Sequence, residues 1–123
     1  MNAEVRIPTE ADREQIARVL STSLHFPLEN ALARSPSFPL QDIRCAYVDD
    51  RVVATAAEFP FTQWFGGNGL ACSGVWGVAT EPERRGAGFA SACLGTLMDD
   101  ARRRGTPVTA LFPAVIEPYR RLG

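Results

Sequence analysis

Residues 43–80 constrain the fold more than any other part of the sequence, because they combine strand-forming patterns with two turn signals. Asp49-Asp50 marks the first turn and Gly66-Gly67-Asn68-Gly69 marks the second, and these residue types tolerate the backbone of hairpin turns. Strands joined by such short turns pair in opposite directions. We therefore expect three consecutive strands in an antiparallel meander.

Three residues inside this meander interrupt regular strand pairing. Pro60 lies in the middle strand and cannot donate a backbone hydrogen bond, so we expect a bend, a bulge or an edge position there. Gly74 and Gly77 lie in the last strand, where a missing side chain often marks a bulge or the close approach of another molecule's backbone. The last strand is therefore a candidate binding edge.

Further helices and strands are predicted on both sides of the meander. We expect a strand at 4–8, a helix at 9–24 capped by its first residue, and a short helix at about 28–33. After the meander we expect a helix at about 86–104, a buried strand at 108–112 and a final short helix. Apolar residues recur every three or four positions in the two longer helices: Ile16, Val19, Leu20 and Leu24, then Phe89, Ala90, Cys93, Leu94, Leu97, Met98 and Ala101.

Length and composition fit one domain without a strong bulk charge. The chain has 123 residues, of which 46% are hydrophobic and 22% charged, and its net charge is -1. We expect a single domain over residues 1–123 and no nucleic-acid partner. Because no apolar run approaches the ~18 residues of a membrane span, we also expect no membrane partner. The beginning of the sequence lacks a secretory signal pattern, which favours a cytoplasmic location.

The cysteines and the histidine do not form a recognisable site. Cys45, Cys72 and Cys93 are widely spaced in apolar surroundings, which favours reduced core residues over disulfides or metal ligands. His25 is the only histidine and has no partner nearby in the sequence for a metal site or a nucleophile pair. We therefore expect no metal.

The sequence Arg84-Arg85-Gly86-Ala87-Gly88 opens the long helix and has the character of an anion site. A helix start leaves backbone N–H groups unpaired and carries a partial positive charge, and small side chains leave those donors uncovered. The two arginines can add forked hydrogen bonds to phosphate oxygens. Because Glu81 and Glu83 balance the arginine charges, the backbone must supply much of the attraction. The spacing suits a pyrophosphate.

Two other glycine loops fit this segment poorly. A P-loop needs a lysine followed by Ser or Thr, and the chain contains no lysine. A dinucleotide loop needs a third glycine and a preceding parallel strand, whereas "GAGFAS" lacks that glycine and follows an antiparallel meander. Neither mononucleotide nor dinucleotide binding is favoured by these patterns.

The segments "VWGVATEPERRGAGFASACL" and "ALFPAVIEPYRRLG", together with the order of elements, resemble the GCN5-related N-acetyltransferase (GNAT) superfamily. The second segment looks most like the enhanced intracellular survival (Eis) type of acetyltransferase. The resemblance implies an α/β (α+β) GNAT fold with a mixed, mostly antiparallel central sheet flanked by helices. It also implies acetyl-CoA as cosubstrate, no metal, and direct transfer of the acetyl group to a primary amine.

The resemblance further implies roles for particular residues. The last meander strand would offer backbone groups to the pantetheine arm, and the glycine loop would hold the pyrophosphate. Tyr119 matches the tyrosine that similar enzymes use as general acid, because a neutral phenol can protonate the leaving sulfur. Tyr47 has no such match and is expected to be a packing residue. The expected cofactor-binding residues are Trp76, Gly77, Val78, Arg84, Arg85, Gly86, Ala87, Gly88, Phe89 and Ala90.

The general base is not assigned by the resemblance. In Eis-type enzymes it is a carboxylate at the end of a considerably longer chain. Glu58 could act through water, but its strand position favours a solvated carboxylate. Arg102-Arg103-Arg104 could suggest a nucleic-acid contact, but a solvated helix end neutralised by Asp99 and Asp100 is favoured.

A complete GNAT domain continues beyond its last short helix with strands that close the sheet. We therefore expect the chain to be the N-terminal fragment of a larger protein or a gene product cut short, with its C-terminal strands missing and an open sheet edge that invites self-association into a homo-oligomer. The acceptor stays open between drug, polyamine, peptide and protein lysine. The alternatives are a non-catalytic GNAT-like domain that binds acyl-CoA or serves as a scaffold, and an unrelated anion-binding regulatory domain.

Overall fold

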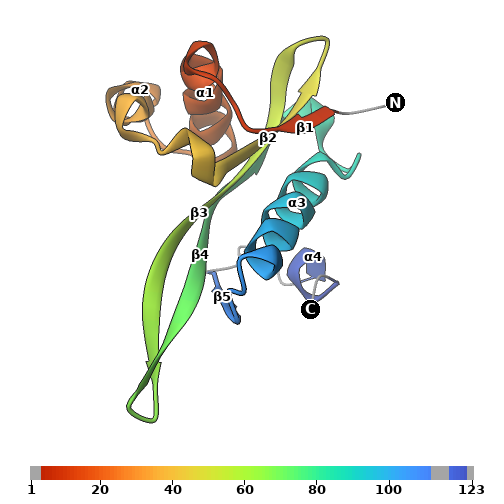
Figure 1. The fold of residues 1–123 in the computed structure, drawn as a ribbon. Coiled ribbons are helices and arrows are strands. Elements are labelled where there is room, and N and C mark those ends of the chain that lie inside the picture. Colours follow the sequence, from red (N-terminus) through yellow and green to blue (C-terminus); the bar gives the residue numbers. More distant parts are fainter. Residues whose placement is uncertain (1–3, 112–116, 122–123) are drawn as a thin grey trace.

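The computed structural model describes residues 4–111 and 117–121, and its centre is a five-stranded sheet with the order β1-β2-β3-β4-β5 (Figure 1). Neighbouring strands are antiparallel except β4 and β5, which are parallel. The predicted antiparallel meander is therefore confirmed, and so is the mixed α/β class. The strands are β1 (Glu4–Arg6), β2 (Ile43–Val48), β3 (Arg51–Phe65), β4 (Asn68–Thr80) and β5 (Val108–Ala110).

Helices cover both faces of this sheet. The helices α1 (Arg13–Leu24) and α2 (Leu28–Arg34) lie on one face, and α3 (Phe89–Arg103) lies on the other, with the short α4 (Glu117–Arg120) beside it (Figure 1). Short 3-10 turns precede or connect them at Glu10–Asp12, Ser35–Ser37, Leu40–Asp42 and Pro82–Arg84. None of the helices described is long and apolar enough to cross a membrane.

Two apolar clusters form the core, one on each face of the sheet. The first joins α1 to the sheet and includes Ile16, Leu20, Ile43 and Val52. The second joins α3 to the opposite face and includes Val53, Phe89, Leu94 and Leu97. The apolar stripes predicted for both helices are thus confirmed, except that Leu24 is 46% exposed.

Backbone geometry explains the predicted turns and the position of the proline. Asp49 and Asp50 both have positive φ values, of 50° and 60°, as a tight two-residue hairpin turn requires. Gly66 and Gly67 do the same at the second turn. Beyond Ala57, β3 pairs with β4 alone among the described strands, so Pro60 lies on an edge and its missing donor is tolerated.

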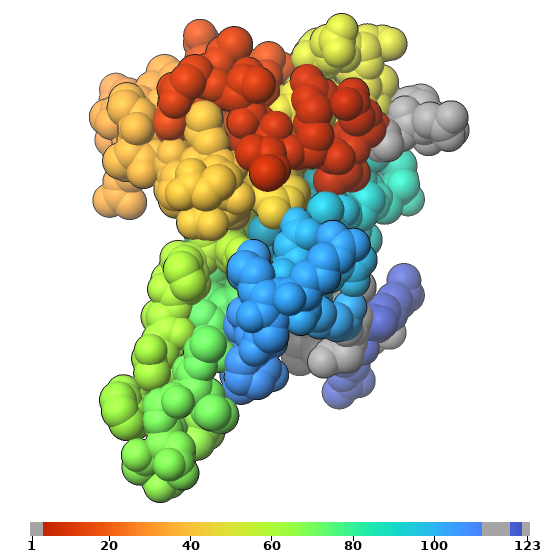
Figure 2. Space-filling model, in the orientation of Figure 1, coloured from red at the N-terminus to blue at the C-terminus, as the bar shows by residue number. Residues whose placement is uncertain are grey.

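The outer part of β3 and β4 forms an arm that extends from the body of the molecule (Figure 2). Its exposed apolar side chains include Phe59, Trp64 and Phe65. The inner part of the same two strands is the centre of the sheet and carries both core clusters. The arm therefore contributes little to the core, whereas the segment near Gly77 is tied to it.

The three cysteines are free and buried, as expected. Burial raises the pKa of the Cys93 thiol to about 12, so the thiol stays neutral and behaves as a small core residue. Tyr47 is also buried, and its hydroxyl donates a hydrogen bond of 2.8 Å to Asp12. These contacts agree with the packing roles predicted for all four side chains.

Candidate functional site

The glycine loop before α3 adopts a conformation that only glycine accepts easily. Gly86 has φ +85° and Gly88 has φ +83°, and a Cβ atom on either residue would meet no atom within 4 Å. The glycines are therefore required by backbone conformation and not by crowding. Because of these left-handed residues the helix begins at Phe89, with Gly88 as its cap, and not at Gly86 as predicted.

Two open pockets are lined by residues of this loop. One of about 280 Å³ is lined by Glu83, Arg84, Arg85, Ala87 and Phe89. Another of about 300 Å³ is lined by Thr80, Arg84, Arg85, Gly86, Gly88, Phe89, Ala90, Ser91 and Arg121. The loop residues expected to bind the cofactor are thus brought together around the start of α3.

Two arginines not considered from the sequence alter the charge at this loop. Arg121 follows α4 directly and lines the second pocket with Arg84 and Arg85, so the C-terminal helix ends beside the loop. Arg51 forms an ion pair with Glu81 at 3.0 Å, so the charge of Glu81 is balanced by Arg51 and does not have to be balanced by the loop arginines. The side chains therefore add more positive charge than the sequence suggested, and the site fits a multiply charged anion better.

The predicted bulge in β4 is present and centres on Gly77. Between the pairs Thr55–Ala79 and Ala57–Trp76, one residue of β3 lies opposite two residues of β4. Gly77 has φ +60°, and its carbonyl oxygen accepts a hydrogen bond of 2.6 Å from the Thr55 hydroxyl. The extra residue disrupts the strand pairing locally, which frees main-chain groups near Gly77 and Val78 for another partner.

On the other edge of β4, the described part of the chain provides no pairing partner at the level of the bulge. β5 pairs with β4 at Cys72, Ser73 and Gly74, and no described residue of β5 pairs with β4 beyond Gly74. The edge from Trp76 to Thr80 can therefore accept an extended ligand. This edge runs from the bulge to the pocket at the glycine loop, because Thr80 lines that pocket.

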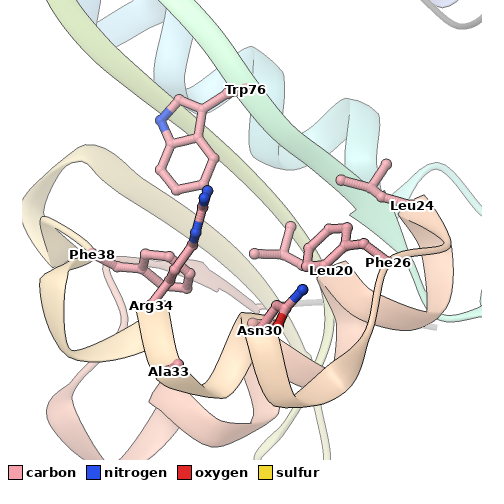
Figure 3. Close-up of a pocket in the computed structure, with 9 residues that line it drawn as sticks. Leu20, Leu24, Phe26, Asn30, Ala33, Arg34, Phe38 and Trp76 are labelled. Atoms are coloured by element: carbon pink, nitrogen blue, oxygen red, sulfur yellow. The ribbon is translucent and has the colours of Figure 1, made fainter.

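A larger cavity, of about 630 Å³, lies on the α1 and α2 side of the bulge (Figure 3). Trp76 forms one wall and contacts Phe38 edge to face at 5.6 Å between ring centroids. The cavity reaches the bulge, since a Cβ on Gly77 would lie 3.3 Å from a methyl group of Leu20, another wall residue. Its described lining consists of Leu20, Leu24, Phe26, Asn30, Ala31, Ala33, Arg34, Phe38 and Trp76.

Tyr119 lies on α4 and packs against the apolar cluster on the α3 face of the sheet. Burial raises the pKa of its phenol above the usual range, so the hydroxyl holds its proton. Trp76 packs against the opposite cluster, and thus the two side chains come from opposite faces. Phe112 and Pro113 of the C-terminal segment lie outside the described residues.

The expectation that Glu58 is solvated is wrong. Its side chain is buried, with the residue 2% exposed, and it accepts hydrogen bonds from the Ser73 hydroxyl and, at 2.6 Å, from the Arg104 guanidinium. Strand alternation turns Glu58 away from the α1 face, toward the C-terminal end of α3. Because Ser73 and Arg104 both bind the Glu58 carboxylate, it is engaged in structural contacts, and this arrangement does not favour a general base.

The arginine cluster at the end of α3 is divided between two roles. Arg102 pairs with Asp99 and Arg103 with Asp100, each at 2.9 Å, as expected for a solvated helix end. Arg104 instead reaches Glu58, which the sequence analysis did not anticipate. Asp100 also binds Arg44, and these contacts lower the pKa of its carboxyl. Arg104 and Asp100 therefore fasten α3 to the sheet, and the contacts of the cluster give no support to nucleic-acid binding.

Comparison with known proteins identifies the family and the fold. A family model described as "Acetyltransferase (GNAT) domain" matches residues 4–123. No curated protein matches the chain.

Solved structures show the same fold. A GCN5-related N-acetyltransferase from Anabaena variabilis superposes with a TM-score of 0.91 at 23% identity, over 99% of this chain and 31% of the other. One from Kribbella flavida has a TM-score of 0.84 at 28% identity, over 99% and 32%. Eis1 from Mycobacterium abscessus has a TM-score of 0.82 at 19% identity, over 98% and 30%. The chain thus spans about a third of the length of these proteins.

Proposed function

Because the chain belongs to the GNAT family of acetyltransferases, we propose that it transfers an acetyl group from acetyl-CoA to a primary amine by direct attack. The observation that carries this proposal is the arrangement along β4. Thr80 lines the pocket at the glycine loop, Gly77 forms the bulge, and Trp76 lines the large cavity. A candidate anion site, a strand edge without a partner among the described residues and a cavity therefore follow one another along one strand.

The dimensions of this strand suit an extended cosubstrate. Thr80 lies four positions after Trp76, which corresponds to about 13 Å at the rise of a β-strand. A pyrophosphate bound at the loop would direct its pantetheine arm along this edge, and main-chain groups near Gly77 and Val78 would hold that arm. The thioester would then lie at the bulge, where an amine could reach it from the cavity.

The chemistry requires the amine nitrogen to lose two protons and the leaving sulfur to gain one. An amine with a pKa near ~10.4 is protonated at neutral pH, and freeing its lone pair costs about 4 to 5 kcal/mol. The neutral amine forms the C–N bond, the C–S bond breaks, and the leaving sulfur takes a proton. We assign that proton to Tyr119, whose raised pKa keeps the phenol protonated. The ammonium gives one proton to solvent before the attack, its nitrogen gives up a second as the amide forms, and solvent returns one proton to the Tyr119 phenol.

A second candidate function is a non-catalytic GNAT-like domain that binds acyl-CoA or serves as a scaffold. It is favoured by the state of Glu58, since the carboxylate considered as a base is occupied by Ser73 and Arg104. Within the family, the Eis type also stays a proposal, because a likeness at 19% identity supports the fold alone. A small-molecule or peptide amine as the acceptor, and assembly into a homo-oligomer, are likewise proposals.

The deciding experiment combines binding with turnover. At a hundredfold excess of acetyl-CoA over its dissociation constant, the protein should gain roughly 2.7 kcal/mol of stability in thermal unfolding. Release of the CoA thiol is then followed with a panel of amines. Stabilisation together with amine-dependent thiol release supports the acetyltransferase, stabilisation without release supports the binding domain, and no stabilisation contradicts both.

A further inference from the structure

The walls of the large cavity select for an apolar ligand. Three aromatic side chains, Phe26, Phe38 and Trp76, and the leucines of α1 supply most of its surface (Figure 3). Asn30 contributes the one uncharged polar side chain of the described lining. A cavity of about 630 Å³ with such walls accommodates a small molecule or one side chain with an apolar or aromatic body.

The charge of the cavity is positive and comes from one residue. Arg34 is the only charged side chain among the described residues of the wall, and none of them is Asp or Glu. Figure 3 shows its guanidinium extending from α2 toward the ring of Trp76. Its side chain makes no hydrogen bond or ion pair with any residue in the described part of the chain. Arg34 is therefore available to an anionic group of a ligand.

We infer that this cavity takes an amine with an apolar, preferably aromatic, body and a carboxylate that Arg34 binds, and that it disfavours polycationic amines. This inference rests on the proposed function, in which the cavity is the acceptor site. A polyamine or aminoglycoside carries several cations, and the described lining offers them no carboxylate and one repelling guanidinium. A carboxylate beside Arg34 would fix the ligand next to Trp76, with its amino group toward Gly77.

The same surroundings also help to prepare the amine for attack. Burial between apolar walls disfavours the charged ammonium, and a guanidinium nearby disfavours it further, so both effects lower the pKa of a bound amine. A larger fraction of the amine is then neutral at pH 7, and solvent suffices to accept the proton. A dedicated carboxylate base is not needed for such an acceptor.

Trp76 provides a direct measurement of binding. The chain has two tryptophans, and Trp64 is 66% exposed at the end of the β3–β4 arm, so a Trp64→Phe variant leaves Trp76 as the single fluorophore. In this background we titrate L-phenylalanine, phenethylamine, which lacks the carboxylate, and spermine. We expect a saturable fluorescence change with L-phenylalanine, weaker binding of phenethylamine and the weakest binding of spermine.

An Arg34→Gln variant tests the role of the guanidinium. It should raise the dissociation constant of L-phenylalanine about tenfold, as expected for the loss of one charge-assisted hydrogen bond, and should not raise that of phenethylamine, whose ammonium the guanidinium repels. Arg102→Gln is the matched control, because Arg102 is an exposed arginine of α3 paired with Asp99. The control should bind all three probes as the parent protein does.

The outcomes separate this inference from the proposed function. The inference is overturned if spermine binds at least as tightly as L-phenylalanine, if Arg34→Gln weakens phenethylamine equally, or if L-phenylalanine does not bind. Thiol release with spermine and not with L-phenylalanine would also overturn it, while leaving the acetyltransferase intact. Suppose that L-phenylalanine binds in a way that depends on Arg34 and that acetyl-CoA does not bind at all. This result would contradict the proposed function but support the inference that the cavity binds an aromatic amine with a carboxylate.

Discussion

The Thr55 hydroxyl donates a hydrogen bond of 2.6 Å to the carbonyl oxygen of Gly77, across the one register shift of the β3–β4 pairing. Thr55 is 1% exposed, and Gly77 has the left-handed φ of +60°. A side chain of the sheet centre therefore holds the bulge that separates the loop pocket from the large cavity. The bond links packing in the core to the geometry of the proposed thioester site.

Replacing Thr55 by valine tests this link, because the change removes the hydroxyl and keeps the branched shape. The carbonyl oxygen of Gly77 then loses this partner, and the free energy of unfolding should fall by about 1 to 2 kcal/mol. The affinity for acetyl-CoA should fall as well, since the bulge is less firmly held. Thr62→Val, at an exposed position of the same strand, should change neither quantity. Equal effects of the two changes would show that the bond does not support the bulge.

Much of the fold could be predicted from local signals. Asp49-Asp50 and the glycines after Phe65 identify the turns, and the three- and four-residue spacing from Phe89 to Ala101 identifies the buried face of α3. These signals depend on residues that are close in the sequence. The start of α3 was predicted too early because the spacing of apolar residues carries no information about backbone angles. The positive φ values of Gly86 and Gly88 exclude both residues from the helix.

The contacts that sequence analysis missed all join residues far apart in the chain. Glu58 looked solvated because neither Arg104 nor Ser73 is near it in the sequence. Arg121 gave no local sign that it would line the pocket of the glycine loop. The single sequence signal for Glu58 was an acidic residue within an otherwise apolar strand, which is a reason to search for a buried partner.

Arg85 should contribute to cofactor affinity through the pyrophosphate alone. It lines both pockets at the glycine loop. An Arg85→Gln variant should raise the dissociation constant of CoA about tenfold, because one charge-assisted contact to phosphate is lost. Binding of acetyl-pantetheine, which has no pyrophosphate, should not change. Arg103→Gln, which removes an exposed arginine paired with Asp100, is the control for general charge. Isothermal titration of both ligands measures the difference, and equal losses for both would place the phosphates elsewhere.

Tyr119→Phe should lower turnover and spare cofactor binding. General acid catalysis typically contributes about 10²-fold or more, so kcat should fall by that order while the dissociation constant of acetyl-CoA stays the same. Because burial raises the pKa of the phenol, the wild-type rate should decline only when the pH rises above the usual tyrosine range. The rate falls because the phenol loses its proton, so the same fall should be absent from the Tyr119→Phe variant. A pH profile of kcat with the same alkaline limb in both proteins would remove Tyr119 from the reaction.

The pair of Glu58 and Arg104 should stabilise the protein without taking part in the chemistry. Arg104→Gln leaves a carboxylate that is 2% exposed with the Ser73 hydroxyl as its remaining donor, and unfolding should become easier by about 2 kcal/mol. This is less than for a fully buried pair, because the Arg104 side chain is 47% exposed.

The double variant separates the lost pair from the buried charge. Adding Glu58→Gln to Arg104→Gln removes that charge, and so should restore part of the lost stability. Arg103→Gln, at a side chain that is 77% exposed, should change stability by no more than about 0.5 kcal/mol. Urea unfolding of the variants measures these differences, and thiol release measured alongside should persist in Glu58→Gln. Loss of turnover in a stably folded Glu58→Gln protein would instead indicate that Glu58 is the general base. It would contradict the purely structural role that we infer from its contacts with Ser73 and Arg104.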